Sequence, residues 1–467
     1  MIDVILIQPP VAFNKAVLGN DMVPNCPHLG LLYLEEGVKK AGLSVKILDL
    51  MDISYEIKDI LKYIKENNTK IVGLTAMTMN IRGALQIAKA IKENLGDTCH
   101  VCLGGPHVSA DPDFIKRFPY FDFAIRGEAD MVFPRIASDI VSKKIDHKGL
   151  IEAEAPSNLD ELPILRRESV DYDLCKRRNL YANHLMATRG CPFSCIFCSI
   201  PAMLRKFRKR SPKLVVEEIR GLYKLNNINH FTFCDDVFTL DRQYVLELCS
   251  EIANLDRKIT WEAQTRASLV DDALLKAMSK TGCTKIIFGV ESGSERIRNE
   301  VVNKKVTNEE IRTATKLCWK YNIEPDWYLM LGFPTEMREE LMETVNFPIK
   351  CAPGPNVIGV HITMPLPGSQ IFNSMVENKE MDRSIIDDFA TGKLGDGYKD
   401  FWPYYIPKGM TIAELKEFRL LAYRKFYFRI SYLIRKLLRD IFSLKKLKED
   451  IDQATALFLY GRSTDDK

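Results

Sequence analysis

The chain has 467 residues, of which 46% are hydrophobic and 27% are charged, as is usual for a soluble globular protein. This composition indicates that most of the chain is neither disordered nor collagen-like, and the length predicts about three domains. Lys and Arg total 66 against 62 for Asp and Glu, so charge does not indicate a nucleic-acid partner and we expect none. No apolar run reaches the roughly 18 to 20 residues that a membrane helix needs.

The first ten residues, MIDVILIQPP, form a short apolar run with no basic leader. This pattern predicts a buried strand rather than a signal peptide, and we therefore expect a cytoplasmic protein. Its 12 cysteines then stay reduced. In that setting clustered cysteines indicate metal ligands or catalysts rather than disulfides.

Residues 1–135 alternate short apolar runs with amphipathic helical patterns. The intervening helices are expected to end at Gly42 and Gly96, in the C-cap role. Strands that are apolar throughout and alternate with helices predict a doubly wound parallel sheet of the flavodoxin or Rossmann-like type. In such a sheet, ligands bind beyond the carboxyl ends of the strands. The apolar runs end at Gln8, Leu50, Thr75, Leu103 and Arg126.

Unusual residues follow four of these expected strands. Pro9 and Pro10 follow the first strand, residues 75–80 the third, residues 104–107 (GGPH) the fourth, and Gly127 and Glu128 the fifth. Two adjacent glycines let the backbone come close to a bulky ligand. Turn chemistry alone explains any one of these loops, but four loops at one edge predict a ligand crevice. No G-x-G-x-x-G is present, so a dinucleotide is not favoured.

The rest of the chain divides into three further parts. Residues 136–180 are polar and acidic and indicate a connector. Residues 181–372 repeat the strand–helix alternation, which predicts a partial or complete parallel (β/α) barrel with its active face at the strand C-termini. Its expected strands are residues 184–189, 230–234, 259–264, 285–290, 326–332 and 357–365.

Residues 373–467 predict a mainly helical C-terminal domain that can cover the substrate site. A basic and aromatic helical run extends from Arg424 to Lys448. We interpret it as a packed helix with a solvated basic face. The alternative is peripheral docking on a membrane surface or an acidic partner.

The most specific local pattern is RGCPFSCIFC, which places Cys191, Cys195 and Cys198 at C-x3-C-x2-C spacing just after an expected strand. Three thiolates on one loop can hold three irons of a [4Fe–4S] cluster and leave the fourth open. The alternative is zinc with three cysteines and a histidine, but the nearest histidine, His184, lies inside the preceding strand. The other cysteines are scattered and are typical of small buried residues.

This triplet, with the aromatic Phe197 before its last cysteine, resembles the signature of radical S-adenosylmethionine (SAM) enzymes. The resemblance implies that the open iron chelates SAM and that the reduced cluster cleaves SAM to a 5′-deoxyadenosyl radical. Stretches after four later strands resemble the family's SAM-binding series: CDDVF, WEAQTR, GVESGSE and LMLGFPTE. The residues that this resemblance assigns to SAM are Phe197, Asp235, Asp236, Gln264, Arg266, Glu291, Ser292 and Gly332.

Each of these residues also has a structural interpretation when taken alone. Asp235 and Asp236 can cap a helix, Glu291 can form a structural ion pair, and Gly332 can simply make a turn. The family's usual G-G-E-type stretch is replaced here by CDDVF, which leaves the ligand of the SAM amino group open.

Residues 1–135 resemble the cobalamin-binding domain that precedes the barrel in one branch of this family. The resemblance rests on the proline pair, PHLGLLYL, the LT-x-M loop, LGGPH and RGEAD. The D-x-H-x-x-G motif that supplies a histidine below cobalt is absent, so we expect no such ligand; for His107 we expect a hydrogen bond to a corrin side chain instead. The residues assigned to cobalamin are Pro9, His28, Gly30, Thr75, Met77, Thr78, Gly104, Gly105, His107, Gly127 and Glu128.

The resemblance implies a cobalamin-dependent radical SAM enzyme that methylates an unactivated carbon or a phosphinate phosphorus. One alternative keeps the cofactors but performs cyclisation or ring rearrangement without methyl transfer. A more distant alternative is a non-catalytic cobalamin or redox sensor. The expected partners are a small-molecule, lipid or peptide substrate and an external reductant such as flavodoxin or ferredoxin. No residue is singled out as a catalytic acid or base.

Overall fold

The computed structural model describes residues 1–10, 28–49, 56–172, 175, 183–394, 403–430 and 432–434. These divide into two compact units, and each is described by itself. Unit 1 comprises residues 1–238, 247–260 and 365–403, and unit 2 comprises residues 239–246, 261–364 and 404–467. Residues 365–403 therefore pack with the N-terminal part of the chain, whereas the helix that follows them belongs to unit 2.

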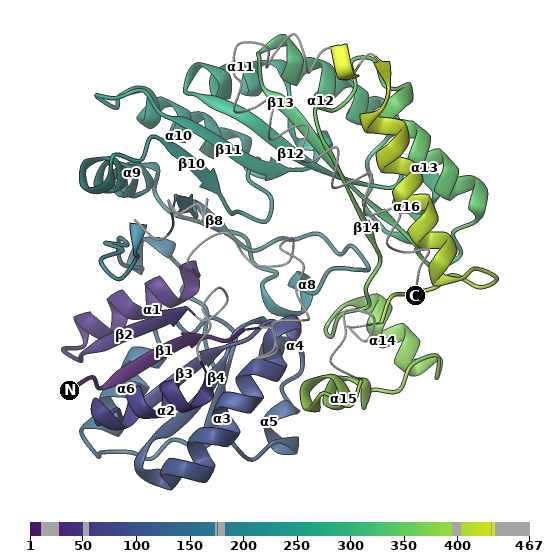
Figure 1. Cartoon of the computed structure of the whole chain (residues 1–467). Coiled ribbons are helices and arrows are strands. Elements are labelled where there is room, and N and C mark those ends of the chain that lie inside the picture. The colour runs from purple at the N-terminus through teal and green to yellow at the C-terminus, as the bar shows by residue number, and fades with distance from the viewer. Residues whose placement is uncertain are drawn as a thin grey trace. The chain divides into compact units, whose positions relative to one another are not determined.

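Unit 1 begins with a six-stranded parallel sheet in the order β2-β1-β3-β4-β5-β6 (Figure 1). This is the doubly wound arrangement expected from the sequence, with its switch point between β1 and β3. The strands are β1 (Val4–Gln8), β2 (Val45–Asp49), β3 (Ile71–Thr75), β4 (His100–Gly104), β5 (Phe123–Arg126) and β6 (Gly149–Glu152). The helices between them are α1 (Leu29–Lys40), α2 (Ile57–Glu66), α3 (Ile81–Leu95), α4 (Pro106–Ala110), α5 (Phe114–Arg117) and α6 (Phe133–Val141).

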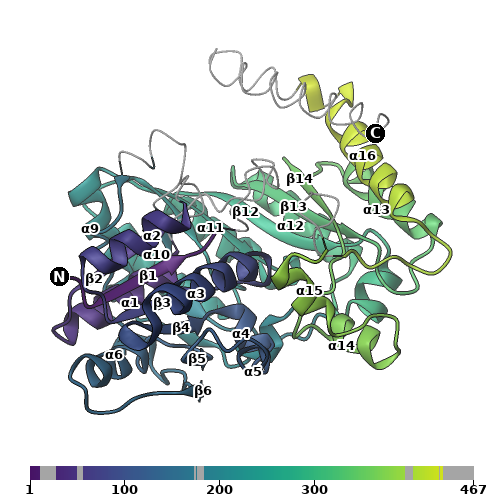
Figure 2. The ribbon, with the colours of Figure 1, turned by 60° about the horizontal axis from the view of Figure 1, so that its bottom comes forward.

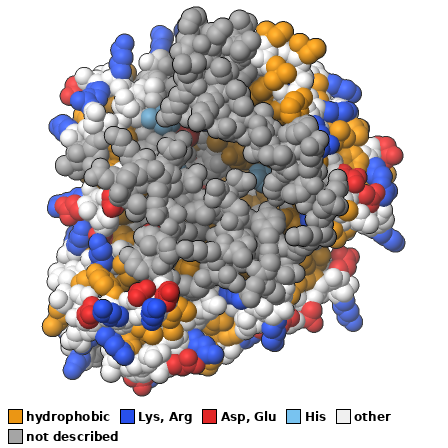
Figure 3. Space-filling view, in the orientation of Figure 1, with side chains coloured by type: hydrophobic (Ala, Val, Ile, Leu, Met, Phe, Trp, Pro, Cys, Tyr) orange, Lys and Arg blue, Asp and Glu red, His pale blue; other side chains and the backbone are white. Residues whose placement is uncertain are grey.

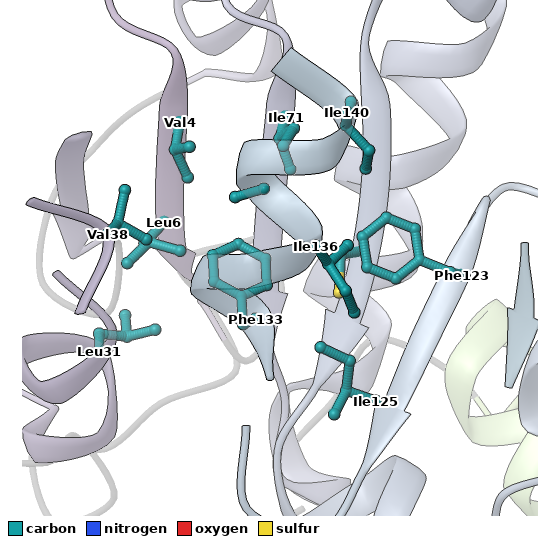
Figure 4. Packing of buried hydrophobic residues seen from close by; sticks show 12 residues of the cluster. Val4, Leu6, Leu31, Val38, Ile71, Phe123, Ile125, Phe133, Ile136 and Ile140 are labelled. Atoms are coloured by element: carbon teal, nitrogen blue, oxygen red, sulfur yellow. The ribbon is translucent and has the colours of Figure 1, made fainter. Parts of the chain in front are cut away.

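The core of this sheet forms because the central strands β1, β3, β4 and β5 consist mainly of buried residues, most of them apolar. Side chains of α1 and α6 pack on β1, β3, β4 and β5, and Figure 4 shows Phe133 and Ile136 of α6 beside Phe123. The predicted helix ends are confirmed: Gly96 caps α3 with φ +56°, and Gly42 follows α1 with φ +81°. Both glycines adopt the left-handed conformation that other residues avoid.

Unit 1 continues into the cysteine-bearing region. Thr188–Arg189 (β8) and Arg208–Lys209 (β9) form a two-stranded antiparallel ribbon around the cysteine triplet. Helix α15 packs against α3, side by side in Figure 2. The remaining elements that lie mainly in this unit are η5 (Leu159–Glu161), β7 (His184–Leu185), α8 (Ile200–Met203), α9 (Pro212–Asn226), β10 (His230–Phe233), α10 (Arg242–Ala253), α14 (Gln370–Glu377) and α15 (Ile385–Thr391).

The second sheet is also parallel and six-stranded, in the order β14-β13-β12-β11-β10-β7. Its unit 2 strands are β11 (Thr260–Thr265), β12 (Cys283–Glu291), β13 (Glu324–Leu331) and β14 (Ile358–Ile362). They agree with the predicted barrel strands to within two residues at most boundaries, and they form a partial barrel in the described residues. The helices of unit 2 are α11 (Asp272–Lys280), α12 (Asn308–Lys320), α13 (Arg338–Lys350) and α16 (Ile412–Tyr427).

Helix α16 covers the outer edge of this sheet. Tyr427 Oη donates to the carbonyl of Ile358 at 3.0 Å, and Tyr423 Oη accepts from the N–H of Val360 at 2.9 Å. These bonds satisfy backbone groups of β14 that would otherwise form an open strand edge. Leu415, Ala422 and Phe426 of α16 are buried while Arg424 and Lys425 are exposed, as expected for a packed helix with a solvated basic face.

Charges of both signs are interspersed over the visible surface in Figure 3, in keeping with the near balance of the composition. Within the described part of the chain, no helix is long and apolar enough to cross a membrane. The basic residues of the C-terminal run beyond Ile434, from Arg435 to Lys448, lie outside the described residues.

Candidate functional site

The cysteine triplet lies on a loop that is closed at its base by the β8–β9 ribbon. The N–H of Cys191 donates to the carbonyl of Leu204 at 3.0 Å, and the N–H of Cys198 donates to that of Cys195 at 3.1 Å. All three thiols are partly exposed and none is in a disulfide. Burial raises the pKa of Cys198 to about 12, and the nearby Cys195 and Cys191 add to this rise. A cationic metal group beside Cys198 would favour its thiolate form.

The donor set fits an iron–sulfur cluster. Soft thiolates favour iron–sulfur clusters over hard-ligand metals, and three of them leave one iron of a cubane open. In the described part of the chain, no three His, Cys, Asp or Glu side chains are grouped as they would be around a single metal ion. Thiolates of a cubane bind different irons and need not converge on one point, so this arrangement is compatible with the predicted cluster. Phe197 lies on the same loop and is partly exposed.

Asp235 and Asp236 follow β10 and bind the chain that leads into the cysteine loop. Asp235 accepts hydrogen bonds from the N–H and Oγ1 of Thr188, the latter at 2.5 Å, and from the N–H of Ala187 at 3.3 Å. Burial raises the pKa of Asp235 to about 7, although these bonds oppose the rise. Asp236 accepts from the N–H of Gly190, and burial raises its pKa as well. Both carboxylates thus have a structural task, and their contact with SAM stays a prediction.

The loops that follow β1, β3 and β4 are joined to one another at the carboxyl edge of the first sheet. Asn80 Nδ2 donates to the carbonyl of Pro9 at 3.2 Å, and Asn80 Oδ1 accepts from the N–H of Met77 at 2.7 Å. Thr78 Oγ1 lies 3.1 Å from His107 Nδ1. The structure therefore brings Pro9, Met77, Thr78 and His107 together at this edge, as the prediction of a ligand crevice requires.

The two adjacent glycines after β4 have different surroundings. A Cβ at Gly105 would lie 2.8 Å from Thr75 Oγ1 and 2.9 Å from the nitrogen of Ala76, and its φ of +95° disfavours other residues. A Cβ at Gly104 would meet no described atom within 4 Å. Gly105 is thus required by the packing of its own loop, whereas Gly104 leaves open space of the kind that a large ligand can fill.

The two predicted histidines are fixed within the protein. His28 begins α1 and accepts from the N–H of Leu31 at 3.3 Å, and Gly30 lies in the same turn beside its ring. The ring of His107 is fully buried and lies edge-on to Phe114 at 4.9 Å. Burial lowers the pKa of each histidine to about 4, so both are neutral at pH 7.

Gly127 and Glu128 follow β5. The N–H of Gly127 donates to Ser109 Oγ at 3.1 Å. Glu128 is buried and binds two arginines of the β8–β9 ribbon, Arg189 and Arg208. The carboxylate that the sequence assigns to cobalamin therefore holds the base of the cysteine loop.

In unit 2, Glu291 ends β12 at an irregularity of the strand. Its φ is +65°, and the pairing of β12 with β13 shifts register between Gly289 and Glu291. Its carboxylate accepts from Lys304 Nζ at 2.5 Å. Strained backbone and bulges recur at functional sites, where they re-aim a side chain. The ion pair with Lys304 is the structural role that the sequence analysis considered for Glu291, and its contact with SAM stays a prediction.

The remaining predicted residues of unit 2 lie at strand ends. Ser292 Oγ is 3.0 Å from Thr344 Oγ1, and Gly332, with φ +86°, donates to Glu336 Oε2 at 2.7 Å. Gln264 is exposed near the end of β11, and Arg266 is buried just after it. Since β11, β12 and β13 are parallel neighbours, these residues share the carboxyl edge of the sheet.

Sequence reasoning missed a polar face on the unit 2 sheet. Residues that alternate with the buried core side chains of β12, β13 and β14 include Lys285, Asp326, Tyr328 and His361. Burial raises the pKa of Asp326 to about 6, with Lys285 opposing the rise. The rings of Tyr328 and His361 meet edge-on with centroids 5.8 Å apart. The two-residue alternation of polar and apolar side chains in these strands was the signal for this face.

Comparison with known proteins agrees with this geometry. Residues 185–347 match the family model "Radical SAM superfamily", and residues 16–137 match "B12 binding domain". The chain is 30% identical over 456 residues to an uncharacterised methyltransferase of Pyrococcus horikoshii, covering 94% of each protein. The chain therefore belongs to the radical SAM superfamily, in the branch that carries a B12 binding domain.

Other relatives show the breadth of this branch. The chain is 27% identical to an anaerobic magnesium-protoporphyrin IX monomethyl ester cyclase of Rubrivivax gelatinosus, covering 89% of this chain and 76% of the cyclase. Its fold matches that of the radical SAM methyltransferase TsrM from Kitasatospora setae, solved with cobalamin and a [4Fe–4S] cluster. That match has a TM-score of 0.68 and 19% identity, and covers 81% of this chain and 78% of TsrM.

Proposed function

We propose that this protein is a cobalamin-dependent radical SAM methyltransferase that acts on an unactivated carbon or a phosphinate phosphorus. The observation that carries the proposal is the full-length relationship to a protein named as a methyltransferase, which covers 94% of each chain. The cysteine loop and the doubly wound sheet support it, because the first fits the iron–sulfur cluster and the second fits cobalamin, and this reaction needs both together with SAM.

Different residues of this chain are proposed to bind the different cofactors. Cys191, Cys195 and Cys198 would hold the cluster, and Gln264, Arg266, Glu291, Ser292 and Gly332 are the candidates for binding SAM in unit 2. The open space at Gly104 would admit cobalamin. When bound, the cluster with SAM supplies a 5′-deoxyadenosyl radical and cobalamin supplies a methyl group that leaves homolytically. The protein's own task is to place these groups and the substrate close together, which turns separate encounters into one internal step.

The second candidate function is cyclisation or rearrangement without methyl transfer. It is favoured by the 27% identity to the cyclase, which extends over 89% of this chain. Residues that hold the cofactors are common to both reactions and do not separate them.

We also infer a need for an external one-electron reductant such as flavodoxin or ferredoxin, because radical formation consumes an electron that no described residue supplies.

Peripheral membrane contact is a further proposal. The exposed apolar side chains Phe428, Ile430, Leu433 and Ile434, next to exposed basic residues of α16, support it. Hydrophobic side chains also gather at the upper right of Figure 3.

The experiment that tests the function is anaerobic reconstitution with iron, sulfide, cobalamin and SAM, followed by product analysis under reducing conditions. Release of 5′-deoxyadenosine distinguishes an enzyme from a sensor. Formation of S-adenosylhomocysteine in step with product distinguishes methyl transfer from cyclisation. Absence of both products with a reconstituted cluster and a range of substrates would refute the proposal.

A further inference from the structure

We propose that Glu128 is a positioning residue that connects the loops at the edge of the B12-domain sheet to the base of the cysteine loop. The inference rests on the proposed function in one respect, namely that the triplet carries the cluster. It assigns Glu128 a different task from the cobalamin contact expected from the sequence. All residues involved lie in unit 1.

The carboxylate of Glu128 binds one arginine with each oxygen. Its Oε2 accepts from Arg189 Nη1 at 2.7 Å, and its Oε1 accepts from Arg208 Nη2. The Glu128 side chain is 6% exposed, and those of Arg189 and Arg208 are 10% and 5% exposed. Two guanidinium groups thus share one buried carboxylate. Charge-assisted bonds of this kind are roughly twice as strong as neutral ones.

The two arginines face each other in the β8–β9 ribbon at the base of the cysteine loop, which we call the neck of the loop. Arg189 of β8 pairs with Arg208 of β9, and the chain between them carries the triplet. The neck is narrow, since a Cβ at Gly190 would lie 2.3 Å from the carbonyl of Lys206. A carboxylate that holds both arginines therefore fixes both ends of the loop together.

The two arginines depend on Glu128 to different degrees. Arg189 has a second carboxylate partner, because Asp130 accepts from both of its terminal nitrogens, at 2.8 and 3.0 Å. In the described part of the chain, Arg208 donates its other hydrogen bonds to neutral carbonyls, those of Pro156 at 2.9 Å and Lys206 at 3.3 Å. A buried charge that loses its counter-charge is destabilised. Loss of the charge on Glu128 should therefore release the β9 side of the neck first.

Hydrogen bonds also connect the loop after β5, which carries Glu128, to the glycine pair after β4. The N–H of Gly127 donates to Ser109 Oγ at 3.1 Å, and Ser109 Oγ donates to the carbonyl of Gly105 at 3.0 Å. Arg126 Nε donates to the carbonyl of Ser109 at 3.3 Å. A continuous set of contacts thus runs from Gly105 through Gly127 and Glu128 to the neck. Through these contacts, a ligand that shifts the loop after β4 can change the geometry of the cysteine loop.

The first test uses Glu128→Gln in the cluster-free protein, so that it does not depend on activity. Hydrogen–deuterium exchange of peptides covering residues 190–208 should rise about tenfold, the order expected for loss of a buried charge-assisted bond. Glu154→Gln is the matched control, because it removes the charge of an exposed carboxylate two residues after β6 and leaves Arg126 with its partners. Its exchange should equal that of the wild type. Unchanged exchange in Glu128→Gln would overturn the proposal.

The second test measures coupling in the reconstituted protein. Cobalamin should change the EPR spectrum and midpoint potential of the wild-type cluster, and Glu128→Gln should remove most of that change while retaining cobalamin. If Glu128→Gln instead loses cobalamin and leaves the loop and the cluster unaltered, Glu128 is a cofactor ligand and the positioning role is wrong. Failure of the wild type to form any cluster would refute the proposed function, while the exchange experiment would still decide the role of Glu128.

A milder variant covers the case in which Glu128→Gln fails to fold. Asp130→Asn leaves Glu128 to hold both arginines and removes only the second partner of Arg189. It should raise exchange on the β8 side of the neck, near Gly190, more than on the β9 side. An effect on the β9 side as large as or larger than that on the β8 side would contradict the assignment.

Discussion

The carboxylate of Glu336 accepts a hydrogen bond from the N–H of Gly332 at 2.7 Å, and its same oxygen accepts from the N–H of Phe333 at 2.9 Å. Gly332 has φ +86° and begins the turn after β13, in the LMLGFPTE stretch that resembles the family's SAM-binding series. A buried acidic side chain therefore shapes the turn at which SAM is expected to bind. Burial raises the pKa of Glu336 to about 7, although these two bonds oppose the rise.

This shift makes stability depend on pH in a definite direction. The unfolded carboxyl group titrates near 4.5 and the folded one near 7, so the unfolded state releases its proton first as the pH rises. The wild type should therefore lose stability between pH 5 and pH 8 relative to Glu336→Gln, by roughly 2 to 3 kcal/mol at about 1.4 kcal/mol per pKa unit. Urea unfolding of both proteins at several pH values measures the difference.

The control for this experiment is Glu339→Gln, which removes an exposed carboxylate two residues into α13. Its difference from the wild type should stay flat over the same pH range. A flat difference for Glu336→Gln as well would show that this carboxyl group is not held in its protonated form by burial.

Much of the fold could be predicted because its determinants are local. The apolar runs gave the strands, and glycines such as Gly42 and Gly96 gave the helix ends. Strand β6 was missed because it is only four residues long and its residues are exposed or half-buried, so it has no apolar pattern.

The ion pairs of the site could not be predicted in the same way. Glu128 binds arginines 61 and 80 residues away, and Asp235 binds Thr188, which lies 47 residues before it. Sequence spacing carries no information about such partners, since they meet only when the sheets have formed. A polar residue at a strand end indicates a functional or structural role. Whether the side chain binds a ligand or holds a loop depends on which residues the fold brings next to it.

The cluster prediction is tested by Cys→Ala at Cys191, Cys195 and Cys198. Each variant should lose most of its iron and its visible cluster absorption after anaerobic reconstitution, because a cubane on this loop has no fourth cysteine in reserve. Cys318→Ala, which changes a buried cysteine of α12, should keep both. Stoichiometric zinc without iron in the anaerobically purified wild type would contradict the prediction.

The cobalamin prediction is tested most cleanly at Gly104. Gly104→Phe should retain much less cobalamin than the wild type, because a Cβ at this position meets no described atom within 4 Å and the ring would take up space expected for the cofactor. Gly105→Ala should lose about 1–3 kcal/mol with or without the cofactor, because of its φ of +95° and its contacts with Thr75 and Ala76. Thermal unfolding and bound cobalamin are measured on both variants. Full cobalamin retention by a folded Gly104→Phe would show that cobalamin does not bind beside Gly104.

The ligand below cobalt is a separate prediction. His107 is fully buried, with its Nδ1 3.1 Å from Thr78 Oγ1 and its ring edge-on to Phe114. The EPR spectrum of bound cob(II)alamin should therefore lack nitrogen superhyperfine splitting from a protein histidine. His107→Gln should leave that spectrum unchanged. A splitting that disappears in His107→Gln would identify the histidine as a ligand.

The reaction itself is tested with SAM that carries a deuterated methyl group. The open space beside Gly104 and the three thiols of the cysteine loop fit a methyl donor and a radical source, and methyl transfer requires both. Because holding donor and radical close makes their reaction internal, the labelled methyl should reach the product without exchange. We expect 5′-deoxyadenosine and S-adenosylhomocysteine to form together, and the product to gain the heavy methyl group. A cyclase would give a product of unchanged carbon count and no S-adenosylhomocysteine linked to it. That result with the native substrate would replace methyl transfer by cyclisation and leave the cluster and cobalamin predictions standing.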